Sequence, residues 1–77
     1  MNITVNFFGA LAEITGKKQL SLNIAQDTDS LKEILFVRFP ALRSKYFLLA
    51  IDKRISNKNE LLKEGNEISF LPPFSGG

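Results

Sequence analysis

The stretch DTDSLKEILFVRFP, residues 27–40, contains the signals of one amphipathic helix. Side-chain oxygens at its start can accept hydrogen bonds from free helix amides, and Ser30 with Glu33 has the spacing of a capping box. The apolar residues that follow recur at three- and four-residue spacing: Leu31, Ile34, Leu35 and Phe39. This spacing places them on one face. Because Pro40 cannot continue the hydrogen-bond ladder, the helix is predicted to stop by Phe39.

Two alternating stretches before this helix predict neighbouring strands. Apolar side chains occupy every second position over residues 3–7, which is the period of a half-buried strand. The same period returns over residues 20–24. Residues 9–16, between the two stretches, lose it and predict a turn or a short helical loop.

Further strands are predicted after the helix. Residues 47–51 are apolar throughout, as in a buried strand, and are followed by a turn at Asp52-Lys53 and a short return strand over 54–56. A turn at 64–66 precedes a last alternating strand over 67–71. Elements in this order predict an α+β fold in which a mixed sheet packs on one main helix.

Length and composition limit what the chain does by itself. Its 77 residues predict one domain, residues 1–77. A chain of this size buries only about 60% of its unfolded surface, which leaves no room for a deep substrate cavity. Cysteine and histidine are absent, which removes disulfides, thiolate nucleophiles, zinc-thiolate sites and the commonest general base. We therefore expect no metal site and little catalytic equipment.

Charge and hydropathy narrow the range of partners. The formal net charge is +2, and acidic residues lie between the basic ones along the chain. Nucleic-acid-binding surfaces usually gather Lys and Arg on one face beside aromatic residues, so no nucleic-acid partner is expected. Apolar runs such as 47–51 are far shorter than the ~20 residues that span a bilayer, and the N-terminus lacks the pattern of a signal peptide. We expect a cytoplasmic protein with no membrane contact.

Residues 72–77, Pro-Pro-Phe-Ser-Gly-Gly, are predicted to form an extended, flexible tail. The two prolines end the last strand because neither has an amide hydrogen for a ladder. Two glycines at a chain end cannot pack a core, and glycine loses the most entropy on ordering. Simple fraying of a terminus is the alternative interpretation. We favour a functional one, because a carboxylate on a tether without side chains can enter a channel too narrow for a β-carbon.

Chemistry at such a carboxylate needs an activating partner. A carboxylate is a poor acyl donor until it becomes a mixed anhydride, and adenylation supplies that leaving group. The chain has no GxxxxGK[ST] loop to cradle phosphates. The nucleotide chemistry is therefore expected to belong to another protein.

The whole chain resembles a known family. The resemblance extends from Ile3-Thr4-Val5-Asn6-Phe7-Phe8, through the turn at 64–67, to Phe70-Leu71-Pro72-Pro73-Phe74-Ser75-Gly76-Gly77. These residues are similar to the small, sulfur-carrying subunit of molybdopterin synthase, most specifically in the last strand, the double proline and the terminal Gly-Gly. The resemblance implies the ubiquitin-like β-grasp fold.

It also implies a reaction cycle. An E1-like enzyme uses ATP to adenylate the Gly77 carboxylate, sulfur replaces AMP to give a thiocarboxylate, and the tail donates that sulfur to a pterin precursor in the large synthase subunit. Gly77 carries the reactive atom, while Gly76 allows passage. The implied assembly is a heterotetramer of two small and two large subunits. In it this chain binds no cofactor and is a non-catalytic sulfur donor of a sulfurtransferase complex.

Other functions remain open at this point. A sulfur carrier for thiamine or for tungsten cofactor synthesis would share the fold and the Gly-Gly ending. A ubiquitin-like protein modifier would share them too, and in a plain β-grasp interaction module the glycines would be incidental. Asp52, where relatives often have Asn, and Phe74, where an aliphatic residue can stand, are departures that leave the partner open.

A docking surface is predicted from side chains on the outer face of the sheet. Alternation places Phe8 and Leu71 opposite the core-facing residues of the first and last strands. These strands lie side by side in a β-grasp sheet, so the two side chains should form one exposed patch near the root of the tail. The resemblance adds Ile55 to this patch, and Phe74, Ser75 and Gly76 to the partner-binding residues.

Two other groups of residues are given structural interpretations. Glu60, Glu64 and Glu67 could form an acidic cluster, but they flank a turn and an exposed strand face, where solvated charge is the normal state. Tyr46 is expected to pack with its hydroxyl in water.

Overall fold

Five strands form one mixed sheet within residues 2–23 and 25–73, which the computed structural model describes. The elements are β1 (Ile3–Phe7), α1 (Ala10–Thr15), β2 (Gln19–Leu22), α2 (Thr28–Arg38), the 3-10 helix η1 (Pro40–Ser44), β3 (Leu48–Ile51), β4 (Arg54–Ser56) and β5 (Glu67–Leu71). The sheet order is β2-β1-β5-β3-β4. Strands β1 and β5 are parallel neighbours and the other pairs are antiparallel. The predicted α+β class is confirmed.

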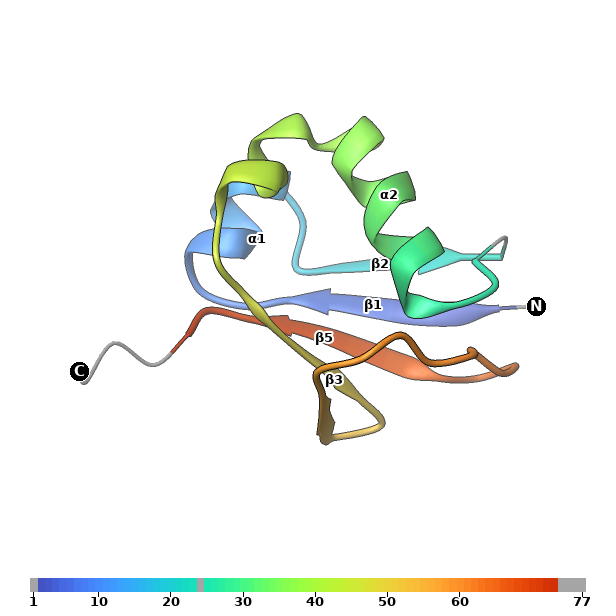
Figure 1. Cartoon of the computed structure of the whole chain (residues 1–77). Helices are drawn as coiled ribbons and strands as arrows, with labels where there is room; N and C mark the ends of the chain where they lie inside the picture. The colour runs from blue at the N-terminus through green and yellow to red at the C-terminus, as the bar shows by residue number, and fades with distance from the viewer. Residues whose placement is uncertain (1, 24, 74–77) are drawn as a thin grey trace.

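The helices cover one face of this sheet and leave the other face open (Figure 1). The covered face follows the predicted alternation, since Ile3, Val5 and Phe7 of β1 are buried beside Ile68 and Phe70 of β5. The rings of Phe7 and Phe70 lie 5.5 Å apart between centroids. The helical layer completes the core with Leu11, Leu31, Leu35 and Leu42.

The start of α2 differs from the predicted one. Asp27 is the N-cap, and its Oδ1 accepts a hydrogen bond from the Ser30 amide at 2.8 Å. The Leu31 amide already donates to the Asp27 carbonyl, so the helix begins before Ser30 and a capping box of Ser30 with Glu33 is wrong. The predicted stop is confirmed, because α2 ends at Arg38 and η1 follows from Pro40.

Two short helical segments contribute to the core. Helix α1 has six residues and agrees with the short helical loop that was one of the two predictions for residues 9–16, and it buries Leu11. The second segment was not predicted. Helix η1 buries Leu42 in the same core. Tyr46, just after η1, is 87% exposed, so the expected packing of its ring is wrong.

Candidate functional site

The candidate site surrounds the C-terminal end of β5. The tail residues singled out by the sequence, Phe74, Ser75, Gly76 and Gly77, lie outside the described residues. Pro72 and Pro73 are the last residues described, so the surface around them is where the tail begins. The sheet places several apolar side chains next to these two prolines.

Strand register brings three apolar side chains to this end on the open face. Strand β5 buries Ile68 and Phe70, so Leu71 points to the opposite face. Leu48 of β3 is the register partner of Leu71. Ile55 of β4 pairs with Ala50, which lies two residues from Leu48 and therefore on the same face.

These side chains line a shallow depression that we call the apolar hollow. Its lining consists of Leu48, Ile55, Leu71, Pro72 and Pro73, and its volume is about 480 Å³. Leu48 is 39% exposed, Ile55 is 54% exposed and Leu71 is half-buried. Because no lining side chain carries a polar atom, the apolar hollow cannot perform acid–base chemistry but can receive an apolar side chain of a partner.

Phe8 lies beside the apolar hollow but lines a different depression. Its side chain is 45% exposed, as alternation predicts, and its amide donates to the Phe70 carbonyl at 3.1 Å. It borders a hollow of about 570 Å³ together with Asn6, Gly9 and Gln19, which we call the Phe8 hollow. The structure therefore brings Leu71 and Ile55 together and places Phe8 in the adjacent depression.

Sequence reasoning missed three residues of the apolar hollow. Residues 47–51 are apolar throughout, so the two-residue period cannot say that Leu48 faces outward. Its pairing with Leu71 decides this orientation. The prolines were interpreted as the end of a strand and the start of the tail, whereas Pro72 and Pro73 also form one wall of the hollow. A large apolar residue at the register position opposite Leu71 was the available signal.

Toward β2, on the other side of the sheet from β4, the open face is polar. Asn6 of β1 donates to Glu67 of β5, with 2.9 Å between Nδ2 and Oε2. Gln19 of β2, the register partner of Asn6, donates from Nε2 to Asn6 Oδ1 at 3.0 Å. Each of these polar side chains thus has a partner on a neighbouring strand. We call this trio the polar end and the residues of the apolar hollow the apolar end.

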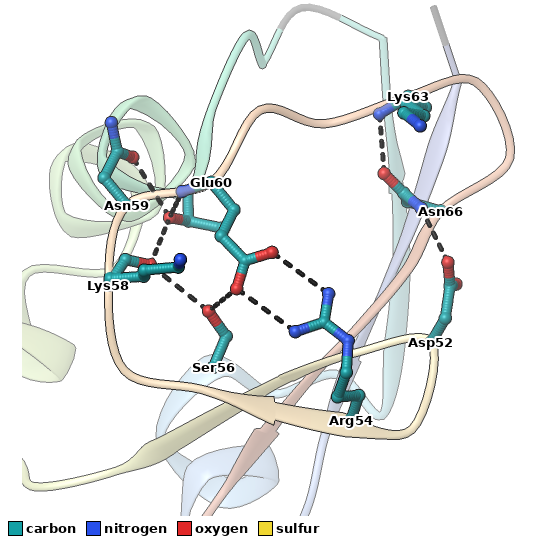
Figure 2. Close-up of polar contacts among 9 residues, drawn as sticks. Asp52, Arg54, Ser56, Lys58, Asn59, Glu60, Lys63 and Asn66 are labelled. Atoms are coloured by element: carbon teal, nitrogen blue, oxygen red, sulfur yellow. Dashed lines mark hydrogen bonds and ion pairs between the residues drawn. The ribbon is translucent and has the colours of Figure 1, made fainter.

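An ion pair holds the edge strand that carries Ile55. Arg54 of β4 reaches both carboxylate oxygens of Glu60, with 3.0 Å from Nη2 to Oε1, and Ser56 also donates to this carboxylate (Figure 2). The hydrogen bonds from Arg54 and then from Ser56 lower the pKa of Glu60 to about 2. Since β4 has only three residues, these contacts are a substantial part of what holds it in place.

The three glutamates do not form the acidic cluster considered from the sequence. Glu60 pairs with Arg54, Glu64 accepts from the Asn2 amide at 2.8 Å and Glu67 accepts from Asn6. In the described part of the chain, no group of three or more acidic side chains is placed to hold a metal ion. The expectation of plain solvated charge is wrong for Glu60, because the sequence does not show that its loop returns to β4.

The same loop is tied to the start of α2. Thr28 is buried, and its Oγ1 donates to Asn59 Oδ1 at 3.1 Å and accepts from the Glu60 amide at 3.0 Å. Asn59 Oδ1 also accepts from the Asp29 amide at 2.9 Å. Asn59 and Glu60 stand next to each other in Figure 2, with the Glu60 side chain turned to Arg54. Through Asn59 and Glu60, this loop is therefore linked both to α2 and to β4, the strand that carries Ile55.

Within residues 2–23 and 25–73, none of the helices has the length and apolar character needed to cross a bilayer. This finding concerns the helical elements alone.

Comparison with known protein families gives a match over nearly the whole chain. The family model described as the ThiS family matches residues 5–77. A curated relative from Caenorhabditis elegans, named molybdopterin synthase sulfur carrier subunit, is 30% identical over 83 residues and covers 100% of this chain and 99% of its own. A relative of the same name from Mycobacterium tuberculosis is 26% identical and covers 100% and 99%.

Solved structures give the same fold. A chain in the complex of subunits 1 and 2 of the molybdopterin-converting factor from Helicobacter pylori is 28% identical, covers 100% of both chains and superposes with a TM-score of 0.78. The small archaeal modifier protein 1 from Methanosarcina acetivorans is 25% identical, covers 99% and 96%, and has a TM-score of 0.82. The architecture is therefore the ubiquitin-like β-grasp, as the resemblance implied.

Proposed function

The chain belongs to the ThiS family, and we propose that it is the sulfur carrier subunit of a molybdopterin synthase. The observation that carries this proposal is similarity to a relative of that name over 100% of this chain, a range that extends over the double proline and the terminal Gly-Gly of this sequence. The described surface supports it, because the place where the tail begins is an apolar hollow suited to a protein partner.

The chemistry proposed for the chain takes place at Gly77. An E1-like partner transfers AMP from ATP to the C-terminal carboxylate, and pyrophosphate leaves. A sulfur nucleophile supplied through that partner then displaces AMP and leaves a thiocarboxylate. The thiocarboxylate sulfur attacks a carbon of the pterin precursor held by the large subunit and displaces an oxygen substituent from it. Water then hydrolyses the resulting thioester, so the sulfur stays on the pterin and the Gly77 carboxylate is restored. This chain contributes the carboxyl group and its tether, and it binds no cofactor of its own in this scheme.

The proposed partner is the large subunit of the synthase. A complex of two subunits solved for the Helicobacter pylori factor supports such a pairing. We propose that the apolar hollow and Phe8 form the docking surface, with Phe74, Ser75 and Gly76 completing it. Assembly as two small and two large subunits, and location in the cytoplasm, stay predictions.

The other functions differ from this one in what is attached to Gly77. Resemblance to an archaeal modifier protein favours a protein modifier as the second candidate, in which the C-terminus would be joined to lysines of other proteins. Carriers for thiamine or tungsten cofactor synthesis would form the same thiocarboxylate and differ only in the acceptor.

The test is an intact mass measurement on the protein purified from its own cells. A gain of about 16 Da, one oxygen exchanged for sulfur, is expected for the carrier. Adducts on other proteins would favour the modifier. If neither the thiocarboxylate nor such adducts are found, both functions are contradicted. The thiocarboxylated protein should then convert the pterin precursor when mixed with the large subunit. A chain without Gly77 should keep its melting temperature and lose this conversion.

A further inference from the structure

We infer that the contact between Gly9 and Pro72 fixes where the tail leaves the sheet, which makes Gly9 a positioning residue for delivery of the C-terminus. This inference rests on the proposed function, because it concerns how that function is carried out. Gly9 lines the Phe8 hollow and Pro72 lines the apolar hollow. Their contact therefore lies between the apolar hollow and the Phe8 hollow, next to the candidate docking residues.

Gly9 has a backbone conformation that other residues avoid. Its φ is +57° and its ψ is −135°. The Leu11 amide donates to the Phe8 carbonyl at 3.1 Å, so Phe8 to Leu11 form a turn with Gly9 at the first central position. These angles are close to those of a type II′ turn, where glycine is strongly preferred because it has no β-carbon.

The missing side chain of Gly9 leaves the space that Pro72 occupies. A β-carbon at Gly9 would lie 2.9 Å from Pro72 Cγ and 3.8 Å from Cδ. Cγ belongs to a closed ring, so it cannot swing away as the end of a flexible side chain would. The backbone of the turn therefore rests directly on the proline ring.

The contact between Gly9 and Pro72 lies just beyond the last hydrogen bonds that β5 makes with its neighbouring strands. The last backbone hydrogen bond between the first strand and β5 at this end joins the Phe8 amide to the Phe70 carbonyl. The register between β3 and β5 ends at Leu71. Pro72 has no amide hydrogen with which to extend either ladder. Its ring is instead positioned by the turn at Gly9, and the tail residues start from that ring.

Placement at Pro72 affects the reaction because the carboxyl group must reach a defined point in the partner. Misplacement of a reacting group by about 1 Å can reduce a rate up to ~100-fold. Four residues lie between Pro72 and Gly77 along the chain, so the contact does not hold the reacting carboxyl group directly. We therefore expect an intermediate loss of about tenfold when the contact is disturbed.

The experiment compares Gly9→Ala with Gly16→Ala in the thiocarboxylated protein bound to the large subunit. Gly16 also has a positive φ, +72°, but a β-carbon there meets nothing within 4 Å. Single-turnover conversion of the pterin precursor at saturating large subunit should fall about tenfold for Gly9→Ala relative to Gly16→Ala. The Kd for the large subunit should change less than about threefold, because the side chains of the apolar hollow remain.

A double-variant cycle separates the contact from backbone strain. Pro72→Ala removes the two nearest ring carbons, so it should lower the turnover rate by itself, about threefold, by loosening the start of the tail. Gly9→Ala combined with Pro72→Ala should then turn over at the rate of Pro72→Ala alone. Two effects that simply multiply would overturn the inference, because strain at Gly9 does not depend on the ring.

Two further measurements test the contact between Gly9 and Pro72 independently of the double-variant cycle. In the isolated chain, nuclear Overhauser cross-peaks should connect the Gly9 α-protons with the Pro72 γ-protons, and their absence would overturn the contact without any activity assay. If Gly9→Ala does not fold, an unchanged turnover rate for Pro72→Ala overturns the positioning role. A wild-type chain that converts no precursor counts against the proposed function, whereas equal turnover by Gly9→Ala and Gly16→Ala counts against this inference alone.

Discussion

The polar end and the apolar end lie on the same open face of one sheet, but their side chains differ in whether they bond to one another. At the polar end, Asn6, Gln19 and Glu67 bond to one another across neighbouring strands. At the apolar end, Leu48 and Ile55 are partly exposed around a hollow. The polar side chains are already hydrogen-bonded to one another, so covering them with a partner would add little binding free energy. Covering exposed apolar area is favourable.

The difference shows that exposure alone does not mark a docking surface. Val37 is 78% exposed and Leu61 is 74% exposed, yet neither lines the apolar hollow. The side chains of the apolar end are less exposed individually, but strand register gathers them at the point where the tail begins. Grouping and position, rather than the exposed fraction of one residue, distinguish this end.

The largest effect is expected from Phe70, whose side chain lies on the core-facing side of β5. Phe70 is fully buried, whereas its neighbour Leu71 belongs to the apolar end. Phe70→Ala should lower the free energy of unfolding by about 3–5 kcal/mol, since it leaves a large cavity in the core. Urea denaturation would measure this loss. An equal loss for Leu71→Ala would show that Leu71 also belongs to the core.

Binding should depend on the apolar end and on Phe8 beside it. Leu71→Ala, Ile55→Ala and Phe8→Ala should each weaken binding to the large subunit at least ~30-fold, because truncating a central anchor costs about 2 kcal/mol or more. Calorimetric titration against that subunit measures the Kd, and Val37→Ala is the matched control, because it removes exposed apolar area elsewhere. Wild-type affinity in Leu71→Ala would contradict a docking role for the hollow.

Changes at the polar end should affect stability slightly and binding hardly at all. Asn6→Ala breaks the hydrogen bonds to Gln19 and Glu67, and a loss of about 1 kcal/mol in the free energy of unfolding is expected. Asn6 also borders the Phe8 hollow, but Phe8 and the apolar hollow are unchanged in this variant, so the Kd for the large subunit should stay within about twofold of wild type. A Kd as weak as that of Leu71→Ala would remove the distinction between the two ends.

The smallest effect concerns how thermal stability depends on pH through the ion pair between Arg54 and Glu60, which lies beside Ile55. The pKa of Glu60 is lowered from 4.5 to about 2 in the folded chain, chiefly by Arg54, so the ionised carboxylate stabilises the fold above the unfolded pKa. This contribution is lost as the pH falls toward about 2. Glu60→Gln should therefore melt below wild type at neutral pH, and the gap should close with acidification.

Thermal melts of the two proteins across this pH range measure the gap. Glu13→Gln, at a position on α1 away from β4, is the control and should not reproduce the pattern. A gap that stays constant down to about pH 2 would mean that the charge of Glu60 is not what stabilises β4.

Most of the fold could be predicted from the period of the sequence. Residues 3–7 alternate strictly, residues 67–70 alternate up to the apolar Leu71, and the structure buries the predicted side chains of both strands. The helix boundary was harder, since several residues near Ser30 can cap a helix and only the backbone shows that Asp27 does. Helix η1 was missed because a five-residue segment that begins with a proline carries no helical period.

The candidate site was predictable only in part. Alternation places Phe8 and Leu71 on the open face, but it cannot measure how far apart their side chains lie, and the structure assigns them to adjacent hollows. Leu48 needed the register of β3, which an unbroken apolar run does not reveal. The Arg54–Glu60 pair and the Gly9–Pro72 contact join segments through loops, and no local pattern encodes them.

The parallel pairing of β1 with β5 also decides how the domain resists mechanical force. The start of β1 and the end of β5 lie at opposite ends of the sheet, with four register pairs between them, Thr4 with Glu67 through Phe7 with Phe70 (Figure 1). A pull on the chain from both of these ends loads the rungs together in shear, whereas pulling open a hairpin breaks them one after another. Single-molecule stretching would register this as one high-force rupture. A carrier with this strand arrangement can be pulled by its tail while its fold stays closed.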